Sequence, residues 1–143
     1  MNVDFMLQAL ELAKNSGDEI PVGALIVKNG EIIAKSGNET VKRNDIRAHA
    51  EMIVMEKAQK KFGKYLYDCD MYVTLEPCPM CAWAILLSGI KNVYFGAYDN
   101  LYGAFGSKIN LNDFLNKKIN IRGGILEQEC SEILKKYFKR VRN

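Results

Sequence analysis

Four side chains, spaced as His49-x-Glu51 and Cys78-x-x-Cys81, are suited to hold and use a zinc ion, and His49 is the only histidine in the chain. One imidazole and two thiolates give Zn²⁺ three protein ligands, and an open fourth position is typical of a catalytic zinc site. Zinc lowers the pKa of a bound water toward neutrality, so that hydroxide forms at physiological pH. A glutamate near the ion but not bound to it can move protons between that water and a substrate nitrogen. The spacing therefore predicts hydrolysis at one Zn²⁺ per subunit.

Each half of this pattern has other interpretations when it is taken alone. A Cys-x-x-Cys pair also occurs in thioredoxin-like redox proteins, but that interpretation leaves His49 and Glu51 without a role. A closed structural zinc site needs a fourth protein ligand, which Cys69 or Cys130 could supply. We expect both cysteines to be free and structural, because buried thiols behave as small hydrophobic groups.

The starts of two predicted helices, over residues 49–62 and 79–87, are expected to position these side chains. Cys78 and Cys81 are three residues apart and therefore lie on the same side of a helix start. The positive end of a helix dipole stabilises a thiolate relative to a thiol. Pro79 suits a first helical position, because its missing N–H costs no hydrogen bond there. The sequence thus predicts two helix N-termini that face one ion.

The remaining predicted elements alternate along the chain. Apolar residues at helical spacing predict further helices over 2–15 and 126–141. Short apolar runs predict strands over 23–28, 31–35, 70–75, 92–97 and 119–122. The Asn29-Gly30 pair is typical of a tight hairpin, because both residues tolerate a positive φ. Together these elements predict an α/β fold, in which a mixed sheet carries helices on both faces.

Length and composition are those of a globular protein with one domain over residues 1–143. Hydrophobic residues make up 48% of the chain and charged residues 26%. No apolar run approaches the length of a membrane span, and the N-terminus lacks the pattern of a signal peptide. We therefore expect a cytoplasmic protein with no membrane partner, whose four cysteines bind metal or stay free in a reducing compartment.

The positive charge is concentrated at the C-terminal end. Residues 1–107 hold 11 basic and 13 acidic residues, whereas residues 108–143 hold 9 basic and 4 acidic residues. Much of the excess lies in the run from Lys135 to Arg142. Such a run can attract phosphates, or it can simply be a solvated helix face with cations at the C-terminus, where the dipole favours them. The charge alone favours the second interpretation.

Residues in and beyond the ligand set resemble the zinc-dependent cytidine deaminase superfamily and, within it, the bacterial tRNA-specific adenosine deaminases. Those enzymes convert the wobble adenosine of an anticodon to inosine. The zinc motif is shared with deaminases of free bases and nucleotides, so the segments after residue 94 discriminate best. The resemblance is carried by Pro21-Val22-Gly23-Ala24, Ala48-His49-Ala50-Glu51, Thr74-Leu75-Glu76-Pro77-Cys78, Met80-Cys81-Ala82, Phe95-Gly96-Ala97, Gly103-Ala104-Phe105-Gly106-Ser107 and Gly123-Gly124-Ile125-Leu126.

The resemblance implies a three-layer α/β/α cytidine deaminase-like fold with a mixed five-stranded sheet. It implies that His49, Cys78 and Cys81 bind the zinc ion and that Glu51 is the catalytic proton shuttle. It also implies a homodimer whose partner is the anticodon loop of tRNA. In that context the basic C-terminal helix fits contact with the anticodon stem.

The substrate-binding residues implied by the resemblance are Asn38, Ala50 and Asp99, with Asn38 matching the residue that hydrogen-bonds the target base. A single-stranded loop lets that base be splayed into a pocket at low cost. Neighbouring bases would then need stacking partners, and three aromatic residues in one glycine-rich stretch are candidates. These are Tyr98, Tyr102 and Phe105.

At some positions the chain departs from the family pattern. Ile46-Arg47 stands where Pro-Thr is usual, Tyr102 where threonine is common, and Trp83 where a small residue is. None of these positions is a predicted ligand. Two other functions stay open: a zinc deaminase of a free base or nucleotide, such as cytidine, dCMP or guanine, and a non-catalytic zinc module that binds RNA.

Overall fold

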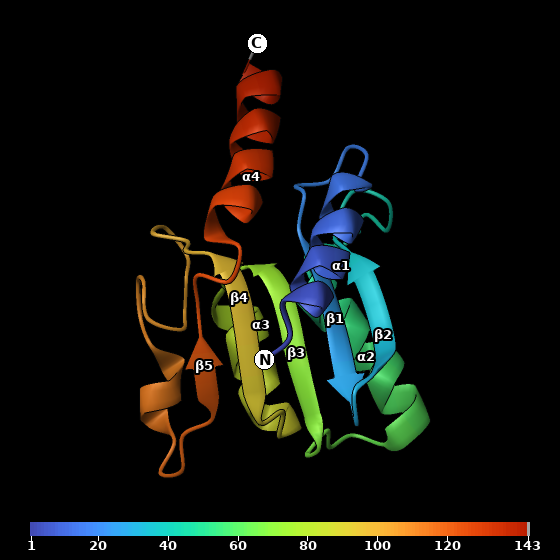
Figure 1. Ribbon diagram of the computed structural model, residues 1–143, viewed down its shortest axis with the longest axis vertical. Coiled ribbons are helices and arrows are strands. Elements are labelled where there is room, and N and C mark those ends of the chain that lie inside the picture. Colours follow the sequence, from blue (N-terminus) through green and yellow to red (C-terminus); the bar gives the residue numbers. More distant parts are fainter. Residues whose placement is uncertain (143) are drawn as a thin grey trace.

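The structure is a computed structural model that describes residues 1–142, and within this range helices and strands alternate along the chain (Figure 1). The predicted domain extends to Asn143, which lies outside the described residues. The helices are α1 (Val3–Lys14), α2 (Ala50–Phe62), α3 (Pro79–Ser88) and α4 (Glu127–Arg142), with a short 3-10 helix, η1, at Leu111–Phe114. The strands are β1 (Gly23–Lys28), β2 (Glu31–Gly37), β3 (Cys69–Leu75), β4 (Asn92–Ala97) and β5 (Asn120–Arg122).

The five strands form one mixed sheet in the order β2-β1-β3-β4-β5. The β1–β2 and β1–β3 pairs are antiparallel, whereas β3–β4 and β4–β5 are parallel. The predicted hairpin is confirmed: Lys28 pairs with Glu31, and Asn29 and Gly30 have φ angles of 51° and 78°. Positive φ at both central residues matches the turn to the twist of the two strands.

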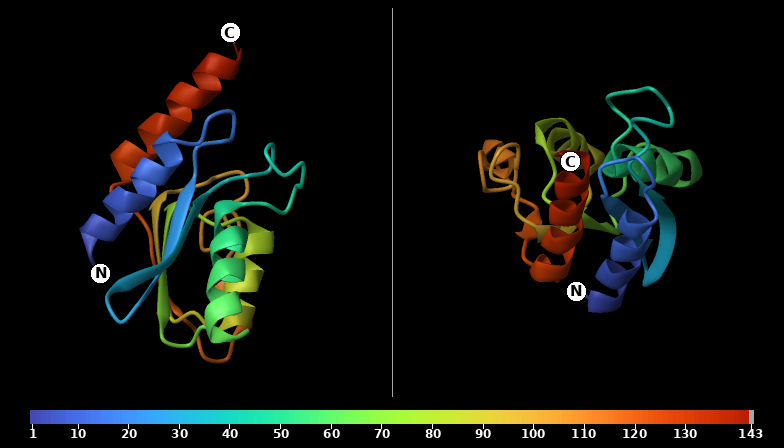
Figure 2. Two further views of the ribbon diagram at one scale, coloured as in Figure 1. Left: turned by 90° about the vertical axis from the view of Figure 1, so that its right-hand side faces the viewer. Right: turned by 90° about the horizontal axis from the view of Figure 1, so that it is seen from above.

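Helices cover both faces of the sheet, as predicted, and give three layers. The helices α1 and α4 lie on one face, and α2 and α3 lie on the other (Figures 1 and 2). Side chains on β3 alternate between the two resulting cores, because successive residues of a strand point to opposite faces. Met71 and Val73 pack in the core beneath α2 and α3, whereas Tyr72 packs in the core beneath α1 and α4.

The predicted element boundaries differ from the observed ones by one or two residues, for local reasons. The last helix was expected from residue 126 but begins at Glu127, because Leu126 has a left-handed φ of 53°. The helix expected from residue 49 begins at Ala50, since His49 has the extended backbone of an N-cap. The short helix η1 was not predicted, because four residues give too little periodicity to detect.

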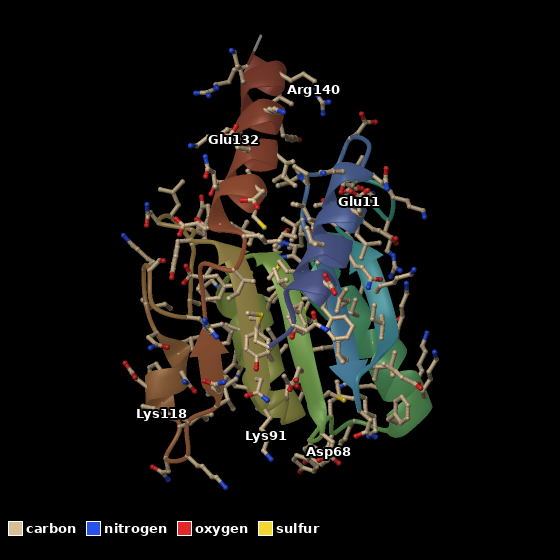
Figure 3. All side chains as sticks on the ribbon, viewed as in Figure 1. Glu11, Asp68, Lys91, Lys118, Glu132 and Arg140 are labelled. Carbon is tan, nitrogen blue, oxygen red and sulfur yellow. The ribbon has the colours of Figure 1, made fainter. Side chains whose placement is uncertain are left out.

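The carboxyl ends of the parallel strands lie at one end of the molecule. The arrows of β3 and β4 point toward the end from which α4 projects beyond the sheet (Figure 1). Figure 3 shows Arg140 of α4 at this end, and Asp68 and Lys91 at the opposite end. Among residues 1–142, no helix has both the length and the apolar character needed to cross a lipid bilayer.

Candidate active site

The predicted ligands stand at the N-termini of α2 and α3. His49 is the N-cap of α2, Cys78 is the N-cap of α3, and Cys81 lies in the first turn of α3 behind Pro79. An N-cap side chain commonly accepts a hydrogen bond from its own helix. Neither His49 nor Cys78 does so here, and their nitrogen and sulfur atoms remain available to a metal ion.

The ligand atoms of His49, Cys78 and Cys81 all lie within 4.8 Å of one another. His49 Nδ1 is 3.6 Å from Cys78 Sγ and 3.4 Å from Cys81 Sγ. An imidazole nitrogen and two sulfurs form a donor set that suits zinc, and three such ligands leave one position open. The chain therefore brings together, from two helices 29 positions apart in sequence, a group that fits one Zn²⁺.

The two thiols at this site differ in acidity. The Cys81 thiol donates to Cys78, and this interaction, with help from His49, lowers the pKa of Cys78 to about 4 despite partial burial. The same interaction and burial raise the pKa of Cys81. His49 also gains a proton more readily, since its contact with Cys78 raises its pKa. The lowered pKa of Cys78 favours its thiolate form, which is the form in which a cysteine binds zinc.

Glu51 lies in the first turn of α2, two residues after His49, and is buried with an exposed fraction of 4%. Burial disfavours the charged form and raises the pKa of Glu51 to about 7. A carboxyl group with a pKa near neutrality can both accept and return a proton at physiological pH. Its position next to the three ligands is the one that the sequence predicted for a proton shuttle.

A cavity of about 400 Å³ opens over this group. His49, Glu51 and Cys78 line this cavity, and so do two of the three predicted substrate-binding residues, Asn38 and Asp99. Its remaining lining comes mainly from Ile20, Val22, Leu75, Glu76, Pro79 and Tyr102. The volume is large enough for a nucleobase, and the site combines apolar walls with a few polar groups.

Asn38 is held in place from two sides. Its Oδ1 accepts from the Ala50 amide at 2.8 Å, and its Nδ2 donates to the Ile20 carbonyl at 3.0 Å. Ala50, the third predicted substrate-binding residue, is fully buried and is not among the residues that line the cavity; its amide reaches the site only by donating to Asn38. A side-chain amide has two N–H groups and two lone pairs, so Asn38 keeps one of each for a ligand.

Asp99 and Tyr102 come from the loop of residues 98–107 that follows β4. The Asp99 carboxylate accepts from the backbone amides of Leu101 and Tyr102 at 3.0 and 3.1 Å, which closes a turn beside the pocket that Asp99 and Tyr102 line. Of the three aromatic candidates for base stacking, Tyr98 and Tyr102 are exposed. Phe105 is not available: it is 6% exposed and packs in the core beneath α2 and α3.

The other two cysteines lie outside the ligand group. Cys69 is buried at the start of β3, and Cys130 is buried on α4 against Gly96. Within the described part of the chain, the metal-binding group contains neither of them. The structure thus gives no fourth protein ligand from these positions, as the sequence predicted.

Arg47, which departs from the family pattern, pairs with a neighbour rather than with the pocket. Its Nε and Nη2 each lie 3.1 Å from a carboxylate oxygen of Asp45. This pairing lowers the pKa of Asp45 through the hydrogen bonds that the guanidinium donates. The side chain of Arg47 is largely exposed, and we find no structural reason for its presence.

Sequence reasoning missed two buried carboxylates, Glu19 and Glu76. Glu19 accepts from the Thr40 hydroxyl and from the amides of Val41 and Lys42, and so secures the loop of residues 38–47. Glu76 secures the 98–107 loop in a comparable way. For Glu76 the available signal was an acidic residue between an apolar strand and a proline, in Leu75-Glu76-Pro77, whereas the residues around Glu19 carry no comparable signal.

Comparisons with known proteins agree with this geometry. Residues 1–97 match the family model of the cytidine and deoxycytidylate deaminase zinc-binding region. The tRNA-specific adenosine deaminase of Aquifex aeolicus is 44% identical over 144 residues, covering 97% of this chain and 95% of that protein. The corresponding Bacillus subtilis protein is 42% identical over 145 residues, covering 96% and 89%.

The fold is also shared with a solved structure from a study of A-to-I editing by tRNA:A34 deaminases at the wobble position of transfer RNA. The two chains superpose with a TM-score of 0.85 at 40% sequence identity. The match covers 93% of this chain and the whole of the other. The similarity therefore includes the elements after residue 97, which the family model does not reach.

Proposed function

Because the chain belongs to the zinc-binding cytidine and deoxycytidylate deaminase family and, within it, to the tRNA-specific adenosine deaminases, we propose that it converts adenosine to inosine at the wobble position of tRNA anticodons. The observation that carries this proposal is that Glu51 lines a base-sized cavity together with His49 and Cys78, which group with Cys81 as a set that could hold one metal ion.

The roles of the residues follow from this placement. His49, Cys78 and Cys81 would hold zinc, which, when bound, makes water acidic enough to act as a nucleophile near neutral pH. The Glu51 carboxylate takes one proton from the attacking water and delivers it to N1 of adenine. The water oxygen bonds to C6, a second proton reaches the exocyclic nitrogen, and the C6–N bond breaks to release ammonia. Adenosine and water thus give inosine and ammonia.

We assign recognition of the base to Asn38 and Asp99, with Ala50 acting through its hydrogen bond to Asn38. The free N–H and lone pair of Asn38 point to a role in reading the polar edge of the base. The burial of Glu51 keeps bulk water from competing for the transferred proton. Tyr102 is exposed at the rim, where it can stack on a base next to the target.

We propose an RNA loop rather than a small molecule as the substrate, and the charge on α4 supports this choice. The basic helix α4 projects beyond the sheet at the end toward which β3 and β4 point, and Arg140 lies near its tip (Figures 1 and 3). Cys78 and Asp99 follow these two strands, so we propose that the cations of α4 meet phosphates of the RNA stem. The last turn of α4 carries Lys139, Arg140 and Arg142. Phosphate contacts of this kind supply affinity without reading the sequence.

A homodimer is the assembly that we propose. The side chains of Trp83 and Leu87 on α3 and of Phe114 on η1 are exposed, and the rings of Trp83 and Phe114 meet edge-on with centroids 6.4 Å apart. Exposed apolar side chains that gather on one face mark an interaction surface. Sedimentation of the wild type and of Trp83→Glu tests this assembly: we expect a dimer that the charge dissociates.

The site of action that we propose is the cytoplasm, a reducing compartment that suits four cysteines of which none forms a disulfide.

The proposed activity is tested with an anticodon stem–loop RNA that carries adenosine at the wobble position. We expect inosine after incubation with the zinc-loaded protein, and none when the same adenosine is sealed in a duplex, where it cannot enter the pocket. Free cytidine, dCMP and guanine are assayed in parallel. Turnover of one of these without inosine formation would contradict the tRNA assignment and leave a small-molecule deaminase.

A non-catalytic zinc module makes a different prediction. It requires a closed site with four protein ligands, whereas three ligands and an open position bind added small anions. The absorption spectrum of cobalt-substituted protein, recorded with and without azide, separates the two. A spectrum that does not respond to azide would favour the closed site.

A further inference from the structure

Glu76 is a buried carboxylate that the reaction itself does not use. It follows the last residue of β3 and precedes Pro77, and its exposed fraction is 2%. A charge so far from water must be satisfied by hydrogen bonds, or its burial costs several kcal/mol. The partners of Glu76 therefore indicate what its burial achieves.

All four of those partners are donors from the 98–107 loop. Oε1 accepts from the Asp99 amide at 3.1 Å and from the Ser107 hydroxyl. Oε2 accepts from the amides of Phe105 and Ser107, each at 3.1 Å. The donors span the loop from its start to its end, so one side chain fixes both limbs of the loop.

These four donors match the four lone-pair sites of an ionised carboxylate. Glu76 lines the cavity, but no acceptor site is left over for a substrate. Its function at the cavity wall is therefore to hold other residues. In this respect Glu76 differs from Glu51, which lines the same cavity together with the proposed zinc ligands His49 and Cys78.

The rest of the loop is built around the Glu76 carboxylate. A Cβ at Gly103 would collide with that carboxyl group and with the Asp99 carbonyl, so the backbone passes too close for any side chain. The Asp99 carboxylate in turn accepts from Leu101 and Tyr102. A chain of hydrogen bonds thus runs from Glu76 through Asp99 to Tyr102 at the pocket rim.

We propose that Glu76 is a positioning residue for substrate recognition, which holds the 98–107 loop so that Asp99 and Tyr102 face the bound RNA. The role rests on the proposed function, since it assigns part of substrate recognition to this loop. The loop donors include no ligand of the proposed zinc site. Loss of the carboxylate should therefore release the loop and leave the metal in place.

The test is Glu76→Gln, a substitution of the same shape that turns part of the acceptor into an N–H donor facing other donors. We expect amide hydrogen exchange of Asp99, Phe105 and Ser107 to become about tenfold faster, because their common acceptor is weakened. We expect KM for the anticodon stem–loop to rise about tenfold with kcat changed less than about threefold, since the groups that transfer protons stay in place. Zinc content should stay at that of the wild type.

Glu19→Gln is the matched control, because it alters a buried carboxylate that holds the other loop. It should speed exchange at Val41 and Lys42 and leave Asp99, Phe105 and Ser107 as in the wild type. Ser107→Ala, which removes one donor of the four, should give a smaller change in the same direction as Glu76→Gln.

Three results would overturn the inference. The first is unchanged exchange of the three amides in Glu76→Gln, and the second is faster exchange spread evenly over the whole chain. The third is a fall in kcat at unchanged KM, which would place the effect on the proton-transfer groups. If the wild type formed no inosine, the proposed function would fail instead, and the exchange measurements would still decide whether Glu76 holds the loop.

Discussion

Asn38 and Ala50 are joined across twelve positions of sequence by a hydrogen bond in which the Ala50 amide donates to Asn38 Oδ1 at 2.8 Å. Ala50 is the first residue of α2, so the bond ties Asn38, to which we assign base recognition, to the helix that carries Glu51. The two proposed roles are thereby held at a fixed separation in the pocket.

Replacing Asn38 should weaken catalysis without removing the metal. Asn38→Ala deletes the contacts to Ala50 and Ile20 and the groups left for the base, so we expect kcat/KM for the stem–loop to fall by about 10- to 100-fold, the equivalent of one or two hydrogen bonds. Asn38→Asp keeps the acceptor for the Ala50 amide but loses the N–H donor. Its kcat/KM should therefore lie between those of the wild type and Asn38→Ala. Zinc retained at wild-type level in both variants is the control, and an unimpaired Asn38→Ala would contradict the role.

Glu51→Gln should bind zinc and fail to turn over. The amide has the shape of the carboxyl group but cannot move a proton, and general acid–base groups contribute about 10²- to 10⁴-fold to rate. Inosine formation should drop by at least about 10²-fold while metal analysis still gives one zinc per subunit. Appreciable residual activity would assign the proton transfer to another group.

Cys81→Ala should lose both zinc and turnover, because it removes one of three ligands. Cys130→Ala and Cys69→Ala provide matched controls, since each removes a buried thiol elsewhere in the fold. Both controls should keep one zinc per subunit and deaminate at close to the wild-type rate. Loss of zinc in either control would indicate a fourth protein ligand and a closed site.

Glu19 should make stability depend on pH in the acidic range. Burial alone would raise its pKa, but the amides of Val41 and Lys42 and the Thr40 hydroxyl outweigh burial and hold the pKa below its usual value of 4.5. A lowered folded-state pKa contributes stability above pH 4.5, and this contribution is lost as the pH falls through the folded-state pKa.

Glu19→Gln should therefore lower the free energy of unfolding at pH 7 by about 1–3 kcal/mol, the cost of leaving buried donors unsatisfied. The difference from the wild type should shrink as the pH falls below 4.5, because Glu19 then becomes protonated in both states. Urea denaturation of both proteins at a series of pH values measures this difference. A difference that stayed constant with pH would show that the ionised form of Glu19 is not what matters.

The parts of the site that could be predicted are those set by short-range pattern. Two cysteines spaced like Cys78 and Cys81 lie on the same side of any helix start. An Asn-Gly pair such as Asn29-Gly30 likewise favours one kind of turn wherever it occurs. The resemblance to known deaminases extended this to Asn38 and Asp99. Both side chains do line the cavity.

The parts that could not be predicted depend on contacts between distant segments. Glu19 and Glu76 accept hydrogen bonds from loops that lie 21 to 31 positions away in sequence. The residues next to each glutamate do not indicate which groups will donate to it. Phe105 is close in sequence to the exposed Tyr98 and Tyr102, but its side chain turns into the core. The backbone is held there by a hydrogen bond from the Ala104 amide to the Pro77 carbonyl and by a β-bridge between Phe105 and Asn110. The left-handed φ of Leu126 is likewise set by the turn that joins β5 to α4.

The separate carboxylate that secures each loop has a consequence for how such a protein can diversify. His49, Glu51, Cys78 and Cys81 stand at the starts of two helices, whereas Glu19 and Glu76 each hold a separate loop next to the cavity. Neither carboxylate bonds to the His/Cys/Cys group, so we expect substitutions confined to residues 40–47 or 99–106 to change one side of the cavity at a time. The contacts that select a substrate can then vary more freely than the groups that would carry out hydrolysis.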